Sequence, residues 1–175
     1  LRDVYKRQAL DALLYLGGTW ENGAFTDAFD FAASTLEETD RVLAVNLAAP
    51  IKLVQRLLPN LRAAATPRCV FMGALTSRDG AASREVANTA SKFGLRGAAR
   101  ALAIALPEIG FTVINPGNVE TPEVIDDIES GRFPAQRPIP MADLLATLDF
   151  VLERSPVAVA QEIDLSQAVS SMMRI

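Results

Sequence analysis

Residues 88–92, Asn-Thr-Ala-Ser-Lys, and residues 93–97, Phe-Gly-Leu-Arg-Gly, form the stretch that decides how the rest of the chain is interpreted. Lys92 comes four residues after Asn88, so on a helix both side chains lie on one face, one turn apart. The surrounding run is rich in alanine, which favours a helix, and Pro107 is the first residue to break it. A lysine in such an apolar segment is either a surface side chain that reaches water or a functional group.

Strand-like segments alternate with helix-like segments along the chain, a pattern typical of α/β folds with parallel sheets. The hydrophobic periodicity predicts strands at 9–18, 69–74, 111–114 and 162–165, and helices at 35–64, 83–106, 124–131 and 140–154. The first helix opens with the capping-box pattern Thr-Leu-Glu-Glu. The order of elements therefore predicts a single α/β unit.

Small, amide and hydroxyl residues stand at characteristic places in this pattern. They are Gly17 and Gly18 at the end of the first strand, Asn46 within the first helix, Thr76 and Ser77 after the second strand, and Asn-Pro-Gly-Asn-Val-Glu-Thr-Pro at 115–122 after the third. Asparagine is disfavoured in the middle of a helix, so Asn46 needs a local reason. Each motif is short, and their common order carries more information than any one of them.

In this order and spacing, the motifs resemble the short-chain dehydrogenase/reductase family from about residue 11 to residue 165. The resemblance implies an α/β fold, namely a partial Rossmann-like doubly wound parallel sheet that holds the fourth to seventh strands of the family fold, with flanking helices. It also implies an oxidoreductase that uses NAD or NADP and transfers a hydride between nicotinamide and a small alcohol or carbonyl substrate.

The resemblance also assigns roles to individual residues. Lys92 is expected to orient the nicotinamide ribose, and Asn46 to kink its helix and bind a water that links the lysine to solvent. Ser77, in preference to Thr76, takes the place of the family's catalytic serine. Asn88 stands where the family has its catalytic tyrosine. The expected cofactor contacts, besides Lys92, are Gly17, Gly18, Pro116, Gly117, Val119 and Thr121.

Plainer interpretations stay open for several of these residues. Ser77 also suits a simple turn, and the Asn46 amide is also explained if it is satisfied locally. Gly17 and Gly18 fit a plain turn that ends a strand. Thr121 precedes a proline and therefore fits the cap of the next helix equally well.

Asn88 separates this chain from the family pattern. A carboxamide has no titratable proton, and the loss of general acid–base help typically costs about 10²–10⁴-fold in rate. The chain has no histidine, and both of its tyrosines lie within the first 15 residues. One hypothesis keeps oxidoreduction, with a proton from Ser77, a water on Asn46, or Glu123. The alternative is a non-catalytic NAD(P)-binding sensor or scaffold.

The glycine pattern and the two ends of the chain predict its domain organisation. Residues 1–8 resemble an adapter-derived scar, 9–166 the C-terminal part of one NAD(P)-binding Rossmann-like domain, and 167–175 a tail. No Gly-x-x-x-Gly-x-Gly turn follows an early strand, so we expect the pyrophosphate-binding part to be absent from this chain. Gly94 and Gly97 lie within a predicted helix and indicate close helix packing.

Composition narrows the classes of partner. Half of the 175 residues are apolar and the formal net charge is −4 without a basic stripe, so we expect no nucleic-acid partner and no membrane span. One cysteine and no histidine predict no metal site, and Cys69 suits a core thiol in the cytoplasm. By the resemblance, the intact protein forms a homodimer or homotetramer. Ile125, Ile128 and Phe133 fall in the family's lid region and favour an apolar small-molecule substrate.

Overall fold

Four parallel strands form the centre of the computed structural model, which describes residues 8–168. The strands are β1 (Ala12–Tyr15), β2 (Arg68–Met72), β3 (Gly110–Pro116) and β4 (Glu162–Leu165). They lie side by side in chain order, with Leu13 opposite Cys69 and Cys69 opposite Phe111. Within the described residues, β1 and β4 are therefore the two edges of the sheet.

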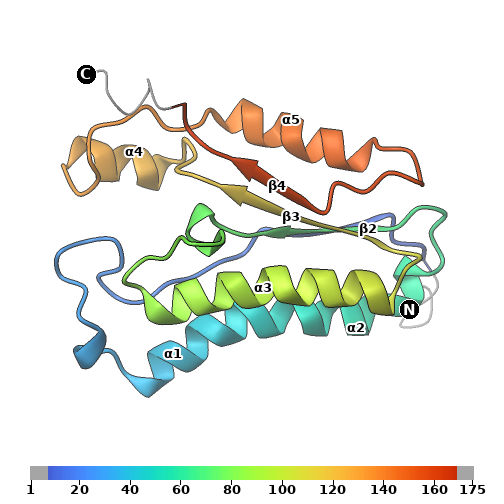
Figure 1. Cartoon of the computed structure of the whole chain (residues 1–175), viewed down its shortest axis with the longest axis horizontal. Coiled ribbons are helices and arrows are strands. Elements are labelled where there is room, and N and C mark those ends of the chain that lie inside the picture. Colours follow the sequence, from blue (N-terminus) through green and yellow to red (C-terminus); the bar gives the residue numbers. More distant parts are fainter. Residues whose placement is uncertain (1–7, 169–175) are drawn as a thin grey trace.

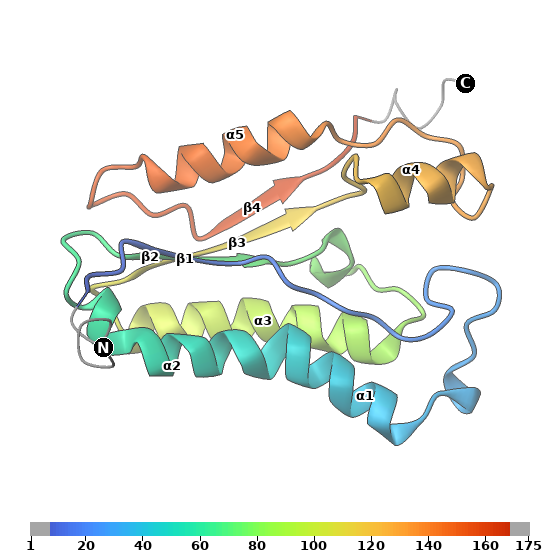
Figure 2. The same cartoon turned by 180° about the vertical axis from the view of Figure 1, so that it is seen from behind.

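Helices cover both faces of this sheet (Figures 1 and 2). On one face lie α1 (Leu36–Leu43), α2 (Ala49–Leu61) and α3 (Val86–Ala105), and on the other lie α4 (Pro122–Glu129) and α5 (Met141–Leu152). Parallel strands need such crossover helices, and helices on both faces bury both sides of the sheet. The predicted doubly wound α/β architecture is confirmed.

A short π-helical segment, Ala44–Ala48, joins α1 to α2 without a break. Asn46 lies at its centre, and single π-helical turns within α-helices often mark functional positions. The irregular turn agrees with the kink that the sequence predicts at Asn46. At the start of α1, the Thr35 hydroxyl accepts a hydrogen bond from the Glu38 amide at 3.2 Å, as the capping pattern predicts.

The continuous helix over Leu36–Leu61 is, by length and composition alone, long and apolar enough to cross a membrane. This differs from the expectation that no segment approaches that length. Three of its side chains, Val42, Val54 and Leu61, are fully buried against the rest of the chain. These side chains lie in the core, whereas only 22% of the most apolar window of the helix is buried among the described residues.

The apolar core has two parts, one on each face of the sheet. The larger lies between the sheet and the α2–α3 layer, and it consists of Val54, Leu61, Cys69, Phe71, Leu95, Ala99, Ile109, Phe111 and Val113. The smaller lies under α5 and consists of Val70, Ile114, Leu148 and Val151. Burial raises the pKa of the Cys69 thiol to about 12, as a packed core thiol should show.

Two predictions about glycines in α3 have different outcomes. A Cβ on Gly94 would lie 2.9 Å from Cδ2 of Leu47, so Gly94 does permit close approach between α3 and the π-helical segment. The same expectation for Gly97 is wrong, because nothing lies within 4 Å of a Cβ there and the residue is exposed.

The predicted terminal segments fall mostly outside the described part of the chain. Residues 1–7 of the predicted scar and residues 169–175 of the predicted tail lie outside the described residues. The Asn60 side chain donates to the carbonyl of Gln8 at 2.7 Å, and Gln167 donates to the side chain of Gln136 at 2.6 Å. Gln8 and Gln167 are therefore in contact with the described fold.

Candidate functional site

Lys92 is a buried lysine whose ammonium lies at the C-terminal end of β2. Its side chain is only 8% exposed, and Nζ donates a hydrogen bond to the carbonyl of Met72 at 2.9 Å. Removal from water lowers the pKa of Lys92 to about 8, since burial disfavours the charged form. Lys92 is therefore not a surface lysine that extends its ammonium into water.

Gly18 packs close to this ammonium. A Cβ at position 18 would lie 3.6 Å from Lys92 Nζ and 3.8 Å from Oδ1 of Asn46. The structure thus brings three predicted site residues together at the C-terminal ends of β1 and β2. In α/β sheets this is the end of the strands at which ligands bind.

The Asn46 side chain connects the loop after β1 to α3. Its Oδ1 accepts from the Thr19 amide at 2.8 Å, and its Nδ2 lies 2.7 Å from the Thr19 carbonyl. Nδ2 also lies 3.3 Å from Oδ1 of Asn88 and 3.1 Å from Oγ of Ser91. The amide is thus satisfied by protein groups, which is the plainer of the two interpretations, and it also contacts Asn88.

Glu21 is a site residue that sequence reasoning missed. Its Oε1 accepts from the backbone amides of Ala87 at 2.7 Å and Asn88 at 3.1 Å, while its Oε2 is buried without a hydrogen-bond partner among the described residues. A carboxylate at this position satisfies free amides of the first turn of α3 and complements the helix dipole. Glu21 lies 66 residues before Ala87, so no local motif could have revealed the contact.

Ser77 lies in a 3-10 turn, Leu75–Ser77, directly after β2. Its hydroxyl donates to the carbonyl of Ala74 at 2.7 Å, and the residue is fully buried. Within the described residues no hydrogen bond joins Ser77 to Asn88 or Lys92. The neighbouring Thr76 hydroxyl is buried and has no partner there. The geometry is that of a turn serine, and a catalytic role for Ser77 stays a prediction.

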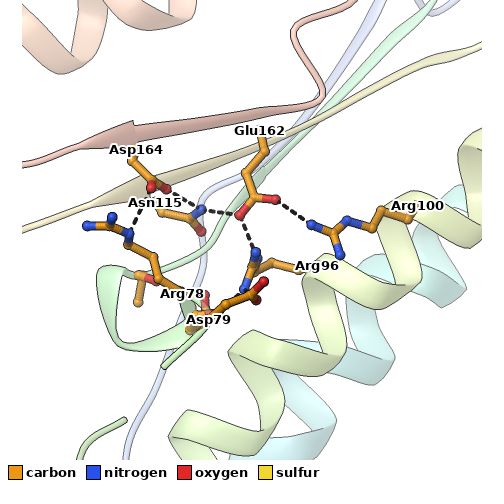
Figure 3. Close-up of polar contacts among 9 residues, drawn as sticks. Arg78, Asp79, Arg96, Arg100, Asn115, Glu162 and Asp164 are labelled. Carbon is orange, nitrogen blue, oxygen red and sulfur yellow. Dashed lines mark hydrogen bonds and ion pairs between the residues drawn. The ribbon is translucent and has the colours of Figure 1, made fainter. Parts of the chain in front are cut away.

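A charged network behind the site connects four elements (Figure 3). Arg96, on α3 one turn after Lys92, is 8% exposed and donates to the carbonyl of Ser77. Its guanidinium also pairs with Asp79 at 3.1 Å and with Glu162 on β4 at 2.5 Å. Arg96 therefore ties the Ser77 turn to the helix that carries Lys92.

Asn115 extends the same network to the end of β3 (Figure 3). Its Nδ2 donates to Glu162 and to Asp164, both at 2.9 Å, and the residue is fully buried. A Cβ on Gly73 would lie 1.9 Å from Asn115 Oδ1, so only glycine fits at that position. Asn115 immediately precedes the turn predicted to contact cofactor, and the network thus fixes where that turn begins.

Gly17 lies beside the Tyr15 ring, which is 3.6 Å from where a Cβ on Gly17 would stand. The other four predicted cofactor residues lie at the end of β3 and in the turn after it. Pro116 is the last residue of β3, and a Cβ on Gly117 would lie 2.7 Å from Oε1 of Gln167. Val119 is buried and forms an isolated bridge with Ile139. None of these contacts involves Lys92, so cofactor binding by the turn stays a prediction.

Thr121 caps α4 in this structure. Its hydroxyl accepts from the Val124 amide at 3.3 Å, with the backbone of Thr121 extended as an N-cap requires. The capping interpretation of Thr121 is thus confirmed. A cofactor contact through the same hydroxyl remains a prediction.

Comparison with known proteins identifies the family. Residues 4–130 match the family model for short chain dehydrogenases, and the chain belongs to this family. It is 32% identical over 129 residues to the short chain dehydrogenase ausX of Penicillium brasilianum, which covers 73% of this chain and 48% of that protein. It is 33% identical over 114 residues to the short chain dehydrogenase adrF of Penicillium rubens, a match that covers 64% of this chain and 42% of that protein. The chain spans about half the length of these curated relatives.

Solved structures share the fold at lower sequence identity. The landomycin C-6 ketoreductase LanV, solved with bound NADP and rabelomycin, superimposes with a TM-score of 0.70 at 22% identity, over 95% of this chain and 63% of that chain. A putative short-chain dehydrogenase/reductase from Burkholderia xenovorans gives a TM-score of 0.70 at 24% identity, over 93% and 66%. These likenesses show the fold.

Proposed function

We propose that the chain is part of an NAD(P)-dependent oxidoreductase that interconverts a small alcohol and its carbonyl compound. The observation that carries the proposal is Lys92, a buried amine with a lowered pKa beside Gly18 and Asn46. Burial of an ammonium group opposes folding, and such groups cluster at functional sites. Family membership and the NADP-bound structural neighbour support the same function.

The residues present fit the nicotinamide-ribose half of the cofactor. Gly18 brings the backbone close to Lys92 Nζ, which has donors for ribose hydroxyls. Gly17 and the turn residues Pro116, Gly117, Val119 and Thr121 would complete this half-site. When bound, the nicotinamide ring supplies or accepts the hydride. We further propose that the pyrophosphate half of the site lies on residues outside this chain, since no glycine-rich turn follows an early strand.

Lys92 is the proposed proton donor in place of the family's tyrosine. An efficient general acid has a pKa near the working pH, and the Lys92 pKa of about 8 meets that condition. During carbonyl reduction the ammonium gives one proton to the substrate oxygen and becomes a neutral amine. Asn88 supplies a carboxamide that hydrogen-bonds without titrating, while Asn46 holds the adjacent backbone in place. The Ser77 hydroxyl already donates to Ala74, which makes it the weaker donor.

Hydride-transfer assays test this proposal. The full-length protein is mixed with NADH or NADPH and a panel of aldehydes and ketones, and cofactor oxidation is followed by absorbance. We expect slow turnover that is lost in Lys92→Met and kept in Lys52→Met, a matched change at an exposed lysine. Asn88→Tyr should raise the rate by about 10²–10⁴-fold, the typical value of general acid catalysis. Background rates in both the wild type and Asn88→Tyr would refute oxidoreduction.

A non-catalytic NAD(P)-binding sensor or scaffold is the second candidate. Two observations favour it, namely the carboxamide of Asn88 at the tyrosine position and the engaged hydroxyl of Ser77. Calorimetry separates the candidates, because this function predicts cofactor binding without turnover. Absence of binding for both NAD(H) and NADP(H) would remove it.

Self-association in the cytoplasm completes the proposal for the intact protein. Leu53, Phe93 and Ile104 expose apolar side chains on α2 and α3, and such surface favours contact with a second copy. The free, buried thiol of Cys69 suits a reducing compartment.

A further inference from the structure

Three aromatic side chains stand in a row above the turn that follows β3. The Trp20 and Phe25 rings meet edge to face with centroids 5.9 Å apart, and the Phe25 and Phe133 rings do so at 6.5 Å. Trp20 is 51% exposed and Phe25 is 37% exposed, although rings of this size usually gain from burial. The row therefore presents apolar surface to whatever occupies the adjacent space.

The backbone of Phe25, the middle residue of the row, has a conformation that phenylalanine rarely adopts. Phe25 has φ of 63°, in the left-handed region, and its amide donates to Oε1 of Glu85 at 2.8 Å. Glu85 is 2% exposed and anchors the start of α3. Backbone strain of this kind collects at ligand clamps, because the surrounding structure has to maintain it. The position of the Phe25 ring is thus enforced by the fold.

A cavity lies between the aromatic row and the turn. Its volume is about 310 Å³, and Gly117, Val119 and Thr121 line it opposite Trp20 and Phe133. Cavities that hold small molecules start at about 300 Å³, so the space suits one compact ligand. Walls made of aromatic edges and faces favour a flat ring over a flexible chain.

The hollow that adjoins this cavity, called the acidic entrance below, is lined by more carboxylates than cations. A second hollow of about 840 Å³ shares Trp20 and Glu123 with the first. Its two arginines are paired, Arg41 with Glu38 at 3.8 Å and Arg132 with Asp127 at 2.6 Å. The remaining carboxylates on its wall are Glu21, Glu37, Glu123 and Asp126, and none has a cationic partner within ion-pair distance among residues 8–168. The negative potential disfavours anionic ligands.

We propose that the cavity bounded by Trp20, Phe25 and Phe133 selects an uncharged carbonyl substrate with a flat ring system, and that the acidic entrance excludes carboxylate and phosphate substrates. The inference rests on the proposed function, because Gly117, Val119 and Thr121 in the cavity wall belong to the turn that the proposed function assigns to the cofactor half-site. It specifies two properties that the family alone does not fix, namely ring shape and charge.

Tryptophan fluorescence tests this inference directly, since Trp20 is the chain's single tryptophan and lies in the cavity wall. The full chain is titrated with 2-acetylnaphthalene, with 2-naphthoate and with the open-chain ketone 2-undecanone, with correction for probe absorbance. We expect saturable quenching by the ring ketone and binding on the order of tenfold weaker for the anion. The open-chain ketone should also bind more weakly.

Matched variants separate the cavity from general effects on the fold. Phe25→Gly removes the ring and relieves the positive φ, so the fold should persist while ring binding weakens on the order of fivefold. Phe133→Ala should weaken it similarly, and Phe150→Ala, at an exposed phenylalanine on α5, should not. Replacing both Glu123 and Asp126 by their amides should reduce the difference in affinity between the ring ketone and 2-naphthoate. Glu129→Gln on the same helix should leave that difference unchanged.

Each outcome has a defined meaning. Tighter binding of 2-naphthoate or of the open-chain ketone, equal losses in Phe150→Ala, or no quenching by any probe would overturn the inference. Binding of the ring ketone without hydride transfer would leave this inference intact and refute oxidoreduction instead. Turnover of short or anionic substrates without ring binding would support oxidoreduction and overturn this inference.

Discussion

Lys92 affects both the stability of the fold and the proposed chemistry. Its ammonium is buried beside the Met72 carbonyl, and burial favours the neutral amine. Asn88, four positions earlier, is within hydrogen-bond distance of Asn46, and both Asn46 and Lys92 lie close to Gly18. The helical spacing thus places Asn88 and Lys92 in one cluster. What the spacing could not supply is the depth of burial, which depends on the sheet beneath α3.

The lowered pKa of Lys92 predicts a pH-dependent stability. The folded-state pKa is about 8 and the unfolded value is about 10.4, so above pH 8 the native state releases a proton that the unfolded state keeps. The free energy of unfolding therefore rises with pH, by about 1 kcal/mol near pH 9 relative to pH 7. Urea unfolding of the wild type and Lys92→Met at both pH values measures this difference. Identical pH slopes would contradict the buried site, and Lys52→Met is the control.

Gly73 and Gly97 form a second test at single positions. Gly73→Ala would place a Cβ 1.9 Å from Oδ1 of Asn115, so we expect a loss of about 1–3 kcal/mol in unfolding free energy. Gly97→Ala meets nothing within 4 Å in α3, so a gain of about 0.4–1 kcal/mol is expected from lower unfolded-state entropy. Thermal and urea denaturation give both values. Equal effects of the two changes would mean that Asn115 does not lie against Gly73.

At the scale of elements, contacts between distant segments position α3. Its first turn has no side-chain cap from its own N-cap residue, Glu85, and the Glu21 carboxylate supplies the acceptors. Further along α3, Arg96 joins the Ser77 turn and β4. Hydrophobic periodicity located the helix because it depends on neighbours in sequence. It could not locate these contacts, because their partners come from other parts of the chain.

Removing the Glu21 carboxylate should destabilise α3. Glu21→Ala leaves the amides of Ala87 and Asn88 without their acceptor, which we expect to cost about 1–3 kcal/mol in unfolding free energy. Glu21→Gln keeps one acceptor oxygen and should cost less. Glu129→Ala, at an exposed residue, should stay within about 0.5 kcal/mol. If urea unfolding gives Glu21→Ala the same stability as the control, the cap does not operate.

At the scale of the whole molecule, the alternation of strands and helices was sufficient to predict a parallel α/β sheet, and the family resemblance supplied the double winding. All four strands and the main helices were predicted, with ends shifted by a few residues, as in β1, which is shorter than 9–18. Within the described residues β1 pairs with β2 alone, and Leu14 and Leu16 are exposed near that edge.

The candidate site was predicted only in part. Gly18, Asn46, Asn88 and Lys92, which the family resemblance singled out, do come together. Trp20, Phe25 and Glu21 were missed as site residues, since the loop over 19–31 has no periodic pattern from which to place its side chains.

Calorimetric titration with NADH and NADPH tests the central claim most directly, namely that Lys92 and Gly18 hold the nicotinamide ribose of a dinucleotide. We expect the full-length protein to bind at least one of the two cofactors, Lys92→Met to abolish this binding, and Lys52→Met to leave it unchanged. Binding of equal strength in Lys92→Met, or no binding of either cofactor by the wild type, would show that Lys92 does not hold the cofactor.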